Sequence, residues 1–165
     1  MIKDVLVPEL SRRFAGLGSF TGTPPEPIAI FPAKHPDVGN VTVYDDGDEA
    51  TVRIEKITHG HFSSYDESLS EAERDRWVTK CVFDFLDDLF ADKVLLWVSE
   101  SGRSGGWKVL RESLKPADVR EGGDIRFFVW SGPVESEERG SDARSSLIVR
   151  DSIWNVIRGY LKRRR

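Results

Sequence analysis

The chain has 165 residues, of which 39% are apolar and 32% charged, and its formal net charge at pH 7 is −4. This length fits one domain with its own core, and the apolar fraction excludes a chain that is disordered throughout. No apolar run is long enough to span a membrane, and the N-terminal residues lack the apolar stretch of a secretory signal. A single cysteine cannot form an internal disulfide and is typical of a reducing compartment. We therefore expect one cytoplasmic domain, residues 1–165, without membrane association.

Charge is unevenly distributed along the chain. The last eight residues contain five basic groups and no acid, so the rest of the chain carries −9. Phosphate binding needs a basic patch on the folded surface, so the acidic body disfavours nucleic acid as a partner. The exception is the basic tail, which comprises Lys162, Arg163, Arg164 and Arg165. A solvated helix end, where the helix dipole favours cations, is the plainer interpretation of this tail.

The N-terminal part of the chain is predicted to contain an arm followed by strands. Residues 1–27 are expected to form an irregular or short helical arm, because their second half is rich in proline and glycine. Residues 28–31 lie between two prolines and are predicted to form the first strand.

A β-hairpin is the clearest local prediction. Residues 41–54 alternate between apolar and polar side chains around Asp46 and Gly47, the pair that a two-residue type I′ turn prefers. With these two residues in the turn, Val43 would lie opposite Ala50. The apolar face of the hairpin would comprise Val41, Val43, Ala50, Val52 and Ile54.

The central helix is predicted to span residues 71–90. Ser70 and Glu73 have the spacing of a capping box, in which the side chain of each accepts a hydrogen bond from the other residue's backbone nitrogen. The cysteine lies within the apolar stripe, so it is interpreted as a small buried side chain and not as a nucleophile. The stripe, which we expect to pack on the hairpin, comprises Val78, Cys81, Val82, Phe85, Leu86 and Leu89.

Strands are predicted again after the helix. Three candidates are residues 94–98, 107–110 and 125–130; they precede a flexible acidic loop at 132–146, an ambiguous segment at 147–149 and a last helix at 151–161. The expected fold class is α+β, with helices packed against one largely antiparallel sheet of about six strands. The expected order is β-β-β-α-β-β-β-α.

The most suggestive cluster for chemistry is a His-x-His pair. His59 and His61 lie two residues apart, so on a strand they point to the same side and would bind one metal ion together. His35 or an acidic residue is the candidate third ligand, because a metal site needs at least three converging ligands. The alternative is that both histidines make ordinary hydrogen bonds at a strand end. No cofactor fingerprint occurs, so no cofactor is predicted.

Aromatic and acidic residues provide candidates for protein binding. Trp97, Trp107 and Trp130 lie on predicted strands, where they would either fill the core or anchor a partner. Asp84 and Asp88 lie near the C-terminal end of the central helix, where they repel each other and oppose the helix dipole. Either cations such as Lys80 and Lys93 compensate them, or they form an acidic patch for a basic partner.

The absence of a nucleophile–base motif favours binding over catalysis. We expect a non-catalytic binding or regulatory protein with a basic protein partner or a second copy of itself. This composition is similar to that of immunity proteins that neutralise toxins, an analogy that no motif supports. The alternative is a metal-dependent enzyme centred on His59 and His61.

Overall fold

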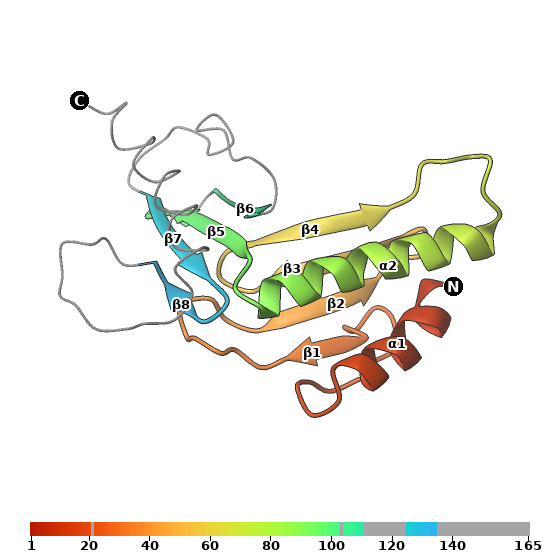
Figure 1. Ribbon diagram of the computed structural model, residues 1–165, viewed down its shortest axis with the longest axis horizontal. Coiled ribbons are helices and arrows are strands. Elements are labelled where there is room, and N and C mark those ends of the chain that lie inside the picture. Colours follow the sequence, from red (N-terminus) through yellow and green to blue (C-terminus); the bar gives the residue numbers. More distant parts are fainter. Residues whose placement is uncertain (21, 103, 111–124, 135–165) are drawn as a thin grey trace.

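The computed structural model describes residues 1–20, 22–102, 104–110 and 125–134, and within them the fold is α+β (Figure 1). The elements in chain order are α1 (Ile2–Arg13), β1 (Ala29–Phe31), β2 (Val41–Asp45), β3 (Glu49–Ile54), β4 (Thr58–Ser63), α2 (Glu71–Phe90), β5 (Val94–Ser99), β6 (Gly105–Val109), β7 (Ile125–Val129) and β8 (Gly132–Pro133). The strands form two antiparallel sheets. The first sheet has the order β1-β2-β3-β4 and the second sheet β6-β5-β7-β8.

The predicted α+β class is confirmed, whereas the single sheet of about six strands and its element order are wrong. A helix precedes the first strand, and four strands precede α2. The chain reverses after Ile54 and returns as β4, which pairs antiparallel to β3. This reversal lacks the Asp-Gly or Asn-Gly signal of a tight hairpin, so β4 was not counted as a separate strand.

Helix α1 occupies the start of the segment expected to be irregular or only briefly helical. Its buried residues are Ile2, Leu6 and Leu10, which recur at the spacing of one helical face. Residue Met1 provides no side-chain cap. Instead the Asp45 carboxylate accepts hydrogen bonds from the backbone nitrogens of Lys3, at 2.9 Å, and Gly47, at 3.0 Å. Because Asp45 is only 6% exposed, these two bonds stabilise a buried charge and hold α1 against the end of β2.

The turn between β2 and β3 lies one residue later than predicted. The backbone nitrogen of Asp46 donates to the carbonyl oxygen of Glu49 at 3.0 Å, so Gly47 and Asp48 are the two central residues. Gly47 has φ = 91°, the left-handed conformation that a type II′ turn requires at its first central position. The predicted Asp46-Gly47 turn is therefore wrong.

The shifted turn changes the strand partners and leaves the faces unchanged. Val43 lies opposite Val52 and not opposite Ala50. A shift of two residues preserves the alternation of a strand, so the predicted apolar face is confirmed. All its members are at most 1% exposed: Val41, Val43, Ala50, Val52 and Ile54.

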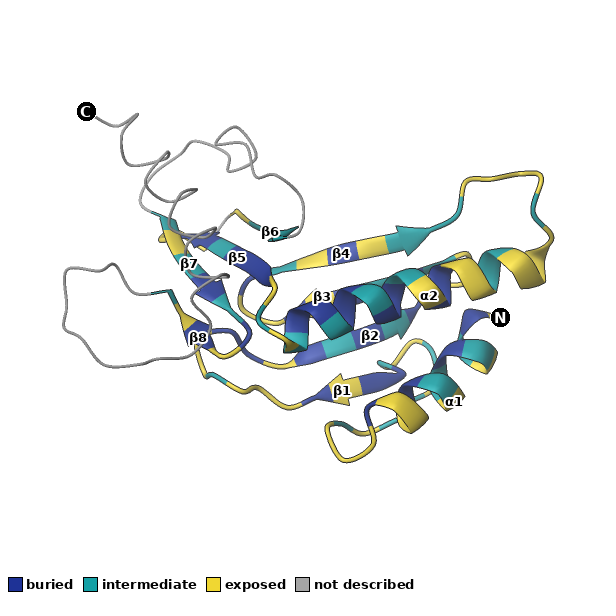
Figure 2. Ribbon diagram, viewed as in Figure 1, coloured by how far each residue is buried: buried dark blue, intermediate teal, exposed yellow. Residues whose placement is uncertain are grey.

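Helix α2 has the predicted bounds and the predicted capping box. The backbone nitrogen of Ser70 donates to Oε2 of Glu73 at 2.8 Å, and that of Glu73 donates to Oγ of Ser70 at 3.4 Å. Cys81 is partly exposed, unlike the rest of its stripe, and burial raises the pKa of its thiol. The buried residues of the stripe are Val78, Val82, Phe85, Leu86 and Leu89. Together with α1 they cover one face of the first sheet (Figures 1 and 2).

The second sheet joins the first sheet where β4 meets β6. A Cβ atom on Gly60 would lie 3.0 Å from the indole nitrogen of Trp107, and one on Gly105 would lie 2.1 Å from the carbonyl oxygen of Ile57. Glycine at both positions therefore permits the close approach. The three predicted strands after α2 correspond to β5, β6 and β7.

Several predictions fall on other parts of the chain. The loop predicted to begin at residue 132 is a strand at its start, since Gly132–Pro133 forms β8. The remainder of that loop, the segment 147–149, the last helix and the basic tail lie outside the described residues. No helix in the described ranges is long and apolar enough to cross a lipid bilayer.

Candidate functional site

The second face of the first sheet is the main candidate site, because both described helices lie on the other face (Figure 2). Strand register places its side chains in two rows. The rows are Ile30–Thr42–Arg53–His59 and Tyr44–Thr51–His61. Arg53, His59 and His61 are exposed, whereas Thr42, Tyr44 and Thr51 are half-buried. We call these seven residues the uncovered face.

An open groove with a volume of about 600 Å³ lies on part of the uncovered face. The turn between β3 and β4 borders it, and Gly102, from the loop between β5 and β6, reaches it as well. The residues that line the groove are Tyr44, Asp46, Thr51, Arg53, Ile54, Glu55, Lys56, Ile57, Thr58, His59, His61 and Gly102. The groove thus brings together the predicted histidine pair, a tyrosine and an arginine.

Hydrogen bonds hold the ring of His61 at one nitrogen. Its Nδ1 lies 2.9 Å from Oε1 of Glu49 and 3.1 Å from Oγ1 of Thr51. The Thr51 hydroxyl donates its proton to Oδ2 of Asp46 at 2.6 Å, and so it accepts from His61. Both partners of Nδ1 are then acceptors, which places the proton of the neutral ring on Nδ1. The lone pair on Nε2 of His61 remains for a ligand.

His59 lies beside His61 and opposite Arg53. The centroids of the two imidazole rings are 4.9 Å apart, and the rings meet edge to face at 87°. Within the described part of the chain, the hydroxyl of Tyr44, the guanidinium of Arg53 and the ring nitrogens of His59 have no hydrogen-bond partner. The groove therefore presents accessible polar groups that can exchange water for a ligand.

The structure brings together two of the three predicted metal ligands. His35 lies elsewhere: its Nδ1 accepts a hydrogen bond from the backbone nitrogen of Asp37 at 3.2 Å, and its ring lies against Gly132. Among the residues that the structure describes, no three His, Cys, Asp or Glu side chains are placed to hold a metal ion. His35 is therefore not the third ligand of the pair in this conformation.

The three tryptophans predicted as binding residues do not form one surface. Trp130 is 6% exposed and packs on Phe90. Trp107 packs on Phe85, with ring centroids 4.6 Å apart. In the strand register Trp107 lies opposite Leu96, whereas Trp97 lies opposite Gly106. Because neighbouring residues of a strand point to opposite faces, Trp97 and Trp107 lie on opposite faces of the second sheet.

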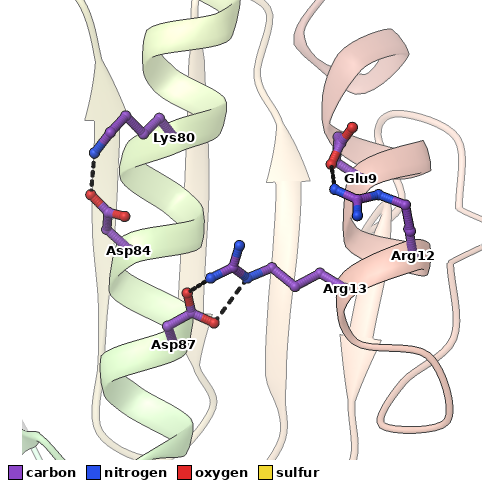
Figure 3. A network of polar contacts seen from close by, with 6 residues as sticks. All are labelled: Glu9, Arg12, Arg13, Lys80, Asp84 and Asp87. Carbon is purple, nitrogen blue, oxygen red and sulfur yellow. Dashed lines mark hydrogen bonds and ion pairs between the residues drawn. The ribbon is translucent and has the colours of Figure 1, made fainter.

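Figure 3 shows Lys80 beside Asp84 and Arg13 beside Asp87 of α2. Oδ2 of Asp84 lies 2.6 Å from Nζ of Lys80, one helical turn earlier. Arg13 of α1 binds Asp87 through two nitrogens, with Nε 3.1 Å from Oδ1. Asp88 is only 9% exposed. Lys80 thus compensates the negative charge of Asp84, which is one of the two interpretations given for this residue.

Two exposed aromatic residues were not singled out from the sequence. Tyr65, in the loop before α2, is 88% exposed, and Trp77 on α2 is 46% exposed. Trp77 lies one residue before Val78, the first member of the predicted apolar stripe. Its position outside the stripe was the sequence signal that its side chain points outward.

Comparison with protein-family models finds no match for the chain, and comparisons with curated proteins and with solved structures find none either.

Proposed function

We propose that the chain is an intracellular, non-catalytic binding or regulatory protein whose protein partner docks on the uncovered face of the first sheet. The observation that carries this proposal is the open groove, in which Tyr44, Arg53 and His59 present polar groups without partners in the described ranges. A binding partner would replace water as the hydrogen-bond partner of these accessible groups.

The residue types on this face support the proposal. Tyrosine and arginine are enriched among the residues that dominate binding energy at protein interfaces. Tyr44 and Arg53 lie on neighbouring strands whose other face is anchored in the core. Such anchoring holds the backbone of the surface in place before a partner binds, which lowers the entropy cost of association.

The same geometry favours the uncovered face over the acidic end of α2. The basic partner expected from the sequence would need free carboxylates there, yet Lys80 offsets the charge of the half-exposed Asp84 and Asp88 is buried. Among the seven residues of the uncovered face, Arg53 carries a fixed positive charge, and Asp46, Glu55 and Lys56 also line the groove. The partner that we propose therefore presents carboxylate or carbonyl oxygens to Arg53 and Tyr44.

Affinity capture with matched variants tests the proposal. The full chain and the double variant Tyr44→Ser/Arg53→Ser would be immobilised and exposed to lysate, after circular dichroism has shown that both are folded. Trp77→Ser is the matched control, since it removes an exposed aromatic residue from α2. A protein retained by the wild type and by Trp77→Ser, and lost from the double variant, would then be purified and its affinity measured.

The expected result is a direct interaction that weakens at least tenfold in the double variant. Equal affinity for the wild type and the double variant would overturn the proposed surface. Loss of the partner in Trp77→Ser alone would place the interface on α2 instead.

A further inference from the structure

We propose that His59 and His61 together form a binding site for one divalent transition-metal ion, with Zn²⁺ as the test ion. This site would exist whether or not a protein docks on the uncovered face. Alternate residues of β4 point to one side, so both imidazole rings stand on the uncovered face.

The spacing of the rings fits a shared ion. Zinc binds a histidine nitrogen at about 2.0–2.1 Å, which places the ring centroid about 3.2 Å from the ion. Two such centroids 4.9 Å apart subtend an angle of about 100° at the ion. This angle is close to the tetrahedral value that zinc prefers. The centroid spacing is therefore compatible with one ion between the rings, once rotation of the exposed side chains directs a nitrogen of each toward it.

The hydrogen bonds of His61 prepare it as a ligand. Metal-binding histidines commonly donate their other ring nitrogen to a carboxylate, which fixes the tautomer and makes the ligating nitrogen more basic. The contact between Nδ1 of His61 and the Glu49 carboxylate, at 2.9 Å, has this arrangement. Nε2 is then the atom that binds the ion. Asp46, bound to Thr51 in the same network, adds negative charge nearby.

One neighbour opposes the site and provides a specific test. Arg53 lies directly opposite His59 in the strand register, so its fixed positive charge repels a divalent cation. The two histidines fall short of the three converging protein ligands that a tightly held metal needs, and no third one is placed beside them in the described ranges, so water would fill the remaining coordination positions. We therefore expect reversible binding that is weaker than at a structural zinc site.

Calorimetric titration of the full chain with zinc chloride measures this binding. The wild type is expected to bind one ion, and His59→Ala and His61→Ala are each expected to lose saturable binding. Glu49→Gln should weaken affinity by about tenfold or more, because it removes the charged acceptor that orients His61. Arg53→Gln should tighten affinity by about threefold or more at low ionic strength. His35→Ala is the matched control, and its affinity should equal that of the wild type.

Two results would overturn the site. The first is the absence of saturable zinc binding by the wild-type chain. The second is binding of unchanged affinity in the double variant His59→Ala/His61→Ala, which would place the ion elsewhere. Circular dichroism of each variant shows whether it is folded. Because His59 and His61 are exposed and none of the other substituted residues is fully buried, we expect all variants to keep the wild-type spectrum.

Discussion

The two faces of the first sheet differ although the same strands build both. On the covered face, Val43 and Val52 pair across the strands and are at most 1% exposed beneath the helices. On the uncovered face, one position further along β3, Arg53 is exposed and borders the groove. Alternation along a strand thus separates residues that stabilise the fold from residues that are available for binding. Substitutions on the two faces should consequently have very different effects on stability.

The largest effect is expected from Phe85→Ala on the covered side. Phe85 is 4% exposed and packs on Phe62 and Trp107, with ring centroids 5.4 and 4.6 Å apart. Its truncation leaves a cavity where both sheets meet α2, so the free energy of unfolding should fall by about 3–5 kcal/mol. Denaturant unfolding followed by circular dichroism measures the loss. A loss below about 1 kcal/mol would show that Phe85 is not part of a well-packed core.

The next effect concerns the buried carboxylate at the end of β2. Asp45→Ala removes the acceptor of the backbone nitrogens of Lys3 and Gly47, and we expect a loss of about 2–3 kcal/mol. Native-state hydrogen exchange should show that the Lys3 amide exchanges faster in Asp45→Ala than in the wild type, by a larger factor than the α2 core amides do. Unchanged protection of Lys3 would contradict the capping role of Asp45.

A smaller effect is expected at the exposed start of α2. Ser70→Ala removes half of the capping box, and the free energy of unfolding should fall by about 1 kcal/mol. Thermal unfolding of wild type and variant at neutral pH provides the comparison. A variant as stable as the wild type would contradict a stabilising cap.

The capping box also predicts a pH dependence. Hydrogen bonds from the side chain and the backbone of Ser70 lower the pKa of Glu73 from its usual 4.5. The contribution of the Glu73 charge to stability is therefore present above pH 4.5 and is lost as pH falls through the lowered pKa. The stability difference between wild type and Glu73→Gln should shrink over that acidic interval, and a difference that is constant with pH would contradict this linkage.

The smallest effect is expected on the uncovered face. Arg53→Ala should change the free energy of unfolding by less than about 0.5 kcal/mol, because the guanidinium is exposed and has no hydrogen-bond partner in the described ranges. The same denaturant experiment serves as the counterpart of Phe85→Ala. A loss comparable to that of Phe85→Ala would remove the distinction between the two faces.

The histidine site shows how far a sequence pattern can be taken. The His-x-His spacing indicated that both rings share one side of a strand, and the structure places them side by side. The contact between Glu49 and His61 was not predicted, because it depends on the register between β3 and β4. His35 was a reasonable third candidate by residue type alone, yet the fold places it against Gly132.

What the sequence determined by itself is local. Helix α2 follows from a capping box and an apolar stripe, signals that lie within one element. The apolar face of the hairpin follows from alternation, which survives the shift in strand partners.

Tertiary structure alone decided the division into two sheets, the groove, and the bond from the backbone of Lys3 to Asp45, which lies 42 residues away. These features depend on contacts between residues far apart in the chain. Which of these contacts form depends on whether the packing they gain exceeds the entropy lost in closing the loop between them. Spacing within a short segment carries no information about that balance.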